Sequence, residues 1–84
     1  MAGGIPALTG PQLSRLLVQK DGWTVEETGT HGRVHVKRTS DGTIRTTVIP
    51  IKNRPLPKGT LAAILGPKET GLGKAGLRRL LKLR

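Results

Sequence analysis

The first hydrophobic pattern in the chain is helical. Three leucines recur at the spacing of one helix face: Leu13, Leu16 and Leu17. Thr9 and Gln12 have the spacing of a capping box, in which each side chain accepts a hydrogen bond from the other residue's backbone N–H at a helix start. Gly22 fits the left-handed position that follows a helix end. We therefore predict a helix over residues 10–20.

Apolar and polar residues then alternate, which is the pattern of half-buried strands. The alternating segments cover residues 23–28, 31–38 and 44–49. Asp41-Gly42 lies between the last two and is typical of a tight hairpin turn. Pro50 ends the third segment, since proline cannot donate to a sheet ladder. These signals predict a three-stranded antiparallel meander.

The second strand has the strictest alternation, Arg33-Val34-His35-Val36-Lys37. Because successive strand residues point to opposite faces, Arg33, His35 and Lys37 share one face. If the strand starts by His31, that residue lies on the same face. We expect Val34 and Val36 to point into the core and the polar row to lie on the solvent-exposed face.

The second half of the chain predicts two shorter helices. One covers residues 60–65, with Thr60 as its cap and Gly66-Pro67 as its stop. Leu77, Leu80 and Leu81 indicate a last helical turn or two. The order α-β-β-β-α, with a small C-terminal helix, predicts an α+β fold with both helices on one face of the sheet.

Composition limits the chain to one domain over residues 1–84, with a modest core. Residues 1–8 are expected to be flexible, and residues 66–84 form a basic, glycine-rich segment. Trp23 is the only aromatic residue, so leucine, isoleucine and valine must build the core. Trp23 itself fits the core better than a base-stacking position.

Several site classes do not fit the composition. With no cysteine, two histidines and five acidic residues, we expect no structural metal site and no cofactor. No apolar run is long enough to cross a membrane, and the first ten residues lack the features of a signal peptide. These features predict a cytoplasmic protein without membrane partners.

The formal net charge is +10 and is unevenly distributed. Residues 1–42 hold five Lys/Arg against four Asp/Glu, whereas residues 43–84 hold ten against one. Such a balance predicts a polyanionic partner. Nucleic acid is the leading candidate, and an acidic protein fits the charge equally well.

A set of short motifs, in order and spacing, resembles the HicA (YcfA-like) toxin family over roughly residues 13–65. The matching segments are Lys20-Asp21-Gly22-Trp23, Gly29-Thr30-His31, Asp41-Gly42, Val48-Ile49-Pro50 and Lys58-Gly59-Thr60-Leu61. Two positions depart from the family pattern. Gly32 stands where members often carry a basic residue or a histidine, and Lys52 stands near the place of a frequent histidine.

The resemblance implies a double-stranded-RNA-binding-like fold and a toxin that cleaves mRNA. It also implies that His31 is the catalytic residue and that a HicB-type antitoxin binds the toxin and masks its site.

The chemistry of the residues fits this expectation. RNA supplies its own 2′-hydroxyl nucleophile, and a histidine titrates near neutrality, so His31 can act as general base or acid without a metal. Neighbouring cations disfavour the imidazolium form. We expect the RNA phosphates to be held by Arg33, Lys37, Arg45 and Lys52. His35 lies too far along the strand to share one phosphate with His31 and is interpreted as an exposed strand residue.

Two other functions remain open at this stage. The same fold serves non-catalytic RNA-binding modules, although those usually cluster lysines where the second helix begins, and here Lys58 stands there alone. A small basic ribonucleoprotein component also fits the charge. Substitution of His31 by alanine distinguishes the three functions. It should abolish cleavage if the protein is an enzyme, and it should leave RNA binding intact if the protein is one of the other two.

Overall fold

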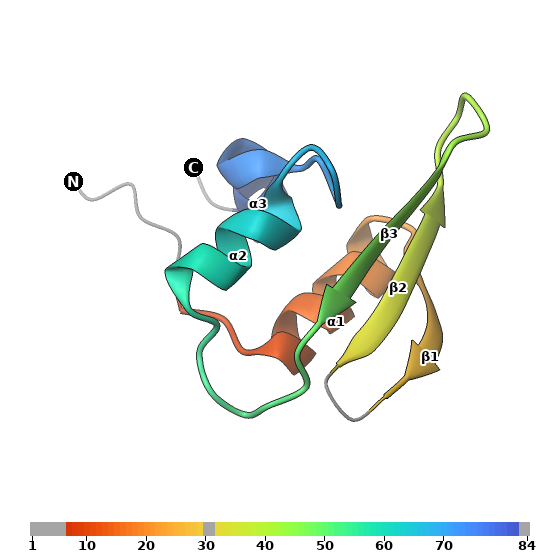
Figure 1. Ribbon diagram of the computed structural model, residues 1–84. Helices are drawn as coiled ribbons and strands as arrows, with labels where there is room; N and C mark the ends of the chain where they lie inside the picture. Colours follow the sequence, from red (N-terminus) through yellow and green to blue (C-terminus); the bar gives the residue numbers. More distant parts are fainter. Residues whose placement is uncertain (1–6, 30–31, 83–84) are drawn as a thin grey trace.

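The order of helices and strands follows the predicted order. The computed structural model describes residues 7–29 and 32–82. Its elements are α1 (Gly10–Lys20), β1 (Thr24–Thr28), β2 (Arg33–Arg38), β3 (Ile44–Ile49), α2 (Lys58–Leu65) and α3 (Gly73–Leu80). Helix α1 lies behind the sheet, and α2 and α3 lie beyond β3 (Figure 1). The arrangement is an α+β fold of the double-stranded-RNA-binding type.

Helix α1 has the boundaries that the sequence signals predict. The Thr9 backbone N–H donates to Gln12 Oε1 at 2.9 Å, and the Gln12 N–H donates to Thr9 Oγ1 at 3.2 Å, which completes the capping box. At the other end, the Asp21 N–H donates to the Leu17 carbonyl. Gly22 follows with a φ of 74°, a conformation that favours glycine.

The sheet is antiparallel in the order β1-β2-β3. Between β2 and β3, the register runs from Arg33 opposite Ile49 to Arg38 opposite Ile44. In the connecting turn, the Thr39 hydroxyl and the Thr43 N–H donate to the Asp41 carboxylate and lower its pKa to about 2. Strand β2 begins at Arg33, so the predicted start at residue 31 is corrected, and Gly32 lies outside the strand.

The helices cover the face opposite to the one predicted. Arg33, His35 and Lys37 do share a face, but it is the face that α1 packs against, and His35 is fully buried there. On β3 the same face carries Thr47 and Ile49, which are also buried.

The predicted core valines of β2 therefore lie on the open face. Val34 and Val36 are only partly buried. They pair with Val48 and Thr46, and Val48 remains 49% exposed. Ile44, also on this face, is 59% exposed. The prediction was wrong because alternation fixes which residues share a face, whereas long-range partners decide which face is covered.

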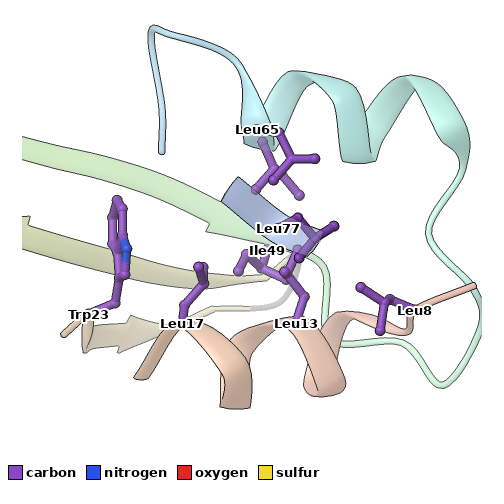
Figure 2. Close-up of a cluster of buried hydrophobic side chains, with 8 residues drawn as sticks. Leu8, Leu13, Leu17, Trp23, Ile49, Leu65 and Leu77 are labelled. Carbon is purple, nitrogen blue, oxygen red and sulfur yellow. The ribbon is translucent and has the colours of Figure 1, made fainter. Parts of the chain in front are cut away.

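The hydrophobic core lies between the sheet and the helices (Figure 2). Its buried members are Leu8, Leu13, Leu17, Trp23, Ile49, Ile64, Leu65 and Leu77. Each buried side chain of this size stabilises the fold by roughly 1.5–3 kcal/mol. Trp23 is 2% exposed and donates its indole N–H to Asp21 Oδ2 at 2.9 Å, so its predicted core position is confirmed.

Helix α2 begins two residues earlier than predicted. Its first residue is Lys58, and Pro57 precedes it without a side-chain capping bond, so Thr60 is not the cap. Proline fixes φ near the helical value, which allows the turn to start there. The predicted last helical turns form the eight-residue helix α3, which packs against α2.

Within the described residues, the helices are too short and too polar to span a membrane.

Candidate functional site

The backbone that flanks His31 lies at the end of the sheet where β3 finishes. The Gly29 N–H donates to the Gly32 carbonyl at 2.8 Å. A Cβ added to Gly32 would lie 2.7 Å from the Ile49 carbonyl oxygen and 3.0 Å from Val48 Cγ1. Gly32 is thus closely packed against β3. His31 itself lies outside the described residues, so its place and role stay predictions.

The absence of a side chain at Gly32 has a structural reason in this chain. A Cβ at 2.7 Å from a backbone carbonyl oxygen forces the backbone to shift. The basic residue or histidine often found there in the resembled family would not fit this packing. A glycine at this position therefore allows the residue before β2 to pack closely against β3.

Two predicted RNA-binding residues of β2 lie on the covered face of the sheet. Arg33 is half-buried opposite Ile49. Lys37 places its Nζ 3.2 Å from Asp21 Oδ1, and both side chains are partly exposed. Asp21 also accepts the Trp23 indole N–H. In this arrangement Lys37 joins β2 to the end of α1, so its charge is partly neutralised.

Arg45 contacts the turn between α2 and α3. Its Nη1 donates to the Pro67 carbonyl at 3.0 Å and to the Glu69 carbonyl at 2.9 Å. The neighbouring Thr47 hydroxyl donates to Glu69 Oε1 at 2.5 Å. Arg45 therefore holds this turn against β3. The predicted contact with RNA would have to be made by the same guanidinium group.

Lys52 is the predicted cation with the most open surroundings. It lies exposed in the connection between β3 and α2, beside a groove of about 410 Å³. Arg54 and Thr60 line the same groove, together with apolar residues between Pro50 and Pro57. Sequence reasoning did not single out Arg54. The signal was present in the close spacing of cations and prolines along residues 50–59.

The structure does not gather the four predicted cations into one cluster. Lys37 and Arg45 are paired across β2 and β3 near the hairpin, at the end of the sheet away from Gly32. Arg33 and Lys52 lie toward the other end, where β2 begins and β3 finishes. Only these two are placed near the residues that flank His31.

His35 is buried, contrary to the exposed position predicted for it. Its Nδ1 lies 3.1 Å from the Arg33 carbonyl oxygen, and its Nε2 lies 2.7 Å from Ser14 Oγ. A carbonyl only accepts, so Nδ1 carries the proton and Nε2 accepts the Ser14 hydroxyl proton. Burial is the main cause that lowers the pKa of His35 below its usual 6.5, and the Arg33 charge adds to it.

The signal for this contact was Ser14, which lies on the same face of α1 as Leu13 and Leu17 and is buried with them. A serine on an apolar helix face needs a hydrogen-bond partner. His35 supplies it from a residue 21 positions away, which no local pattern identifies.

Among the described residues, no group of three or more histidine, cysteine or acidic side chains is arranged to hold a metal ion.

A comparison with family models matches residues 11–76 to the family described as HicA toxin of bacterial toxin-antitoxin. The matched range includes all three strands, α1 from its second residue, and α2. The comparisons with curated proteins and with solved structures gave no significant match.

Proposed function

Because the chain belongs to the family of HicA toxins of bacterial toxin–antitoxin systems, we propose that it is an endoribonuclease that cleaves mRNA without a metal. In this proposal His31 is the catalytic residue. The protein acts in the cytoplasm, and a HicB-type antitoxin neutralises it. The observation that carries the proposal is the family match over residues 11–76, which includes the Gly29-Thr30-His31 signature.

The burial of His35 supports the choice of His31. The chain has two histidines. His35 is 0% exposed, and both of its ring nitrogens are hydrogen-bonded within the protein. It cannot reach a phosphodiester without losing these bonds. Acid–base catalysis by histidine therefore falls to His31.

The proposed reaction uses the RNA's own 2′-hydroxyl. His31 as general base accepts the 2′ proton while the 2′ oxygen bonds to phosphorus. The bond from phosphorus to the 5′ oxygen breaks, and that oxygen takes up a proton, from His31 in its acid form or from water. The products are a 2′,3′-cyclic phosphate and a 5′-hydroxyl end. Of the nearby cations, Arg33 stabilises the negative charge that develops on phosphorus, and Lys52 binds the RNA beside it.

The partner proposal rests on the family and the charge. A family of toxin–antitoxin systems implies a partner that blocks the toxin. The net charge of +10 favours a partner with an acidic surface.

The test is RNA cleavage in excess EDTA by the parent protein, by His31→Ala and by the matched control Gln19→Ala, an exposed position on α1. We expect His31→Ala to lose at least about 100-fold in rate, in line with the loss of a general acid or base. Gln19→Ala should keep the parent rate, and circular dichroism should show that all three proteins are folded.

Equal cleavage by His31→Ala and the parent would rule out His31 as the catalytic residue. RNA binding by the parent protein without any cleavage would favour a non-catalytic RNA-binding module instead.

A further inference from the structure

The connection between β3 and α2 forms a groove beside the end of the sheet. It encloses about 410 Å³. Lys52 and Arg54 line it with exposed cationic side chains, and Pro50, Leu56 and Pro57 supply apolar surface. Among the described residues that line this groove, none carries a negative charge.

This groove is built on a fixed backbone. The Leu56 N–H donates to the Leu8 carbonyl at 2.7 Å, and Pro55 forms an isolated antiparallel bridge with Thr9. At the start of α1, a Cβ added to Gly10 would lie 1.5 Å from the Pro50 carbonyl oxygen. Both ends of the connection thus contact the segment that leads into α1.

The groove also begins next to the residues that flank His31. Pro50 lines it and directly follows Ile49. The Ile49 carbonyl oxygen is the atom that Gly32 packs against, and Gly32 directly follows His31 in the sequence. The groove therefore starts at the end of the sheet where Gly32 contacts β3.

The surface chemistry matches single-stranded RNA, which alternates anionic phosphates with flat, largely apolar bases. An arginine guanidinium can stack on a base and bind a phosphate, and a lysine acts as a point charge for a phosphate. The apolar walls offer contact area to the base that sits between these phosphates. An unpaired strand fits better than a duplex, because bases in a duplex are stacked and not available to a groove.

We propose that this groove binds a nucleotide adjacent to the scissile phosphate of a single-stranded RNA, with Arg54 against the base and Lys52 against its phosphate. The placement of this nucleotide next to the cleaved phosphate rests on the proposed ribonuclease function. The groove's binding of single-stranded RNA is a separate claim, so the two can fail independently.

The test measures binding of a short single-stranded RNA by fluorescence anisotropy, with every variant carrying His31→Ala so that cleavage does not interfere. The groove variant is Lys52→Gln with Arg54→Gln. The matched control is Lys68→Gln with Lys74→Gln, which removes the same charge at exposed positions outside the groove. Thermal unfolding should give the same midpoint for both, since all four side chains are exposed.

We expect the groove variant to weaken binding at least tenfold and the control less than threefold. The slope of log K against log salt should decrease in magnitude by about 0.7, because the variant loses the Lys52 phosphate contact and each such contact with a single strand contributes about 0.7. In the catalytic background, the groove variant should raise KM more than it lowers kcat.

Equal weakening by the two double variants would overturn the proposal, since it would show a general effect of net charge. Unchanged RNA binding with loss of binding to the acidic antitoxin would also overturn it and assign the groove to that protein. If the parent protein does not cleave RNA but the groove variant alone loses binding, the groove proposal stands and the ribonuclease proposal fails.

Discussion

At the scale of single residues, the contact between His35 and Ser14 has the clearest energetic consequence. The pair is fully enclosed, and each polar atom of the imidazole has a partner. Protonating Nε2 would remove its acceptor lone pair and place a cation in the core beside the Arg33 charge. The folded state therefore favours neutral His35, and burial lowers the pKa of this residue.

This shift predicts a loss of stability in mild acid. With a folded-state pKa below the ordinary 6.5, the unfolded chain binds more protons than the native protein as pH falls below about 6.5. The free energy of unfolding should therefore be constant above pH 7 and should decrease below pH 6.5, by at most about 1.4 kcal/mol per pH unit from this group. Urea unfolding between pH 8 and pH 5.5 measures it.

Two histidine variants assign this effect. His31→Ala should keep the decrease, whereas His35→Gln should show a flatter profile whatever its stability at pH 8. A decrease of the same size in His35→Gln would contradict the assignment to His35.

At the scale of elements, the two faces of β3 differ in burial. Ile49 is 0% exposed and packs in the core, while the preceding Val48 is 49% exposed on the open face. Both side chains are β-branched, and both positions pair with β2. The strand thus offers neighbouring positions with the same backbone setting and opposite burial.

Replacing each by threonine tests which face the helices cover. Threonine keeps the β-branched shape that favours strands, so the intrinsic preference changes little. Ile49→Thr loses buried apolar atoms and places a hydroxyl in the core, and we expect a cost of about 2–4 kcal/mol. Val48→Thr should change the free energy of unfolding by less than about 0.5 kcal/mol.

Chemical denaturation of the two variants gives the comparison. Equal costs, or a larger cost for Val48→Thr, would show that the covered face is the one that the alternation of β2 had indicated.

At the scale of the whole molecule, the layers meet closely where α1 begins. Gly10, the first residue of α1, is buried against the Pro50 carbonyl at the end of β3. The same region is bridged by Leu8 to Leu56 and by Thr9 to Pro55. These contacts join the start of α1 to the connection that leads into α2, and they shape the groove proposed to bind RNA.

Gly10→Ala separates this packing from helix propensity. Alanine is the better helix former by about 1 kcal/mol, so propensity alone predicts stabilisation. The added Cβ would lie 1.5 Å from a backbone oxygen, so we expect the packing to dominate and the variant to lose about 1–3 kcal/mol. The matched control is Gly59→Ala in α2, where a Cβ meets nothing within 4 Å and stability should rise by up to about 1 kcal/mol.

Unfolding midpoints of the two variants decide the matter. A stabilised Gly10→Ala would contradict the close approach of α1 to β3.

Local signals determined much of this fold. The capping box of Thr9 and Gln12, the left-handed glycines at 22 and 42, and the proline after Ile49 each act within a few residues. Such interactions are encoded where they occur, so α1 and β3 have the predicted bounds. The family signature around His31 and the skewed charge are likewise properties of the sequence itself.

Tertiary structure decided which side of the sheet became the core. The strand pattern placed Arg33, His35 and Lys37 on one face but could not say what covers it. That face is buried because Ser14 bonds His35, Asp21 pairs with Lys37, and Glu69 accepts from Thr47. These partners lie 16 to 22 residues away in the sequence. A buried polar group is stable only with its partner in place, and only the folded chain brings these partners together.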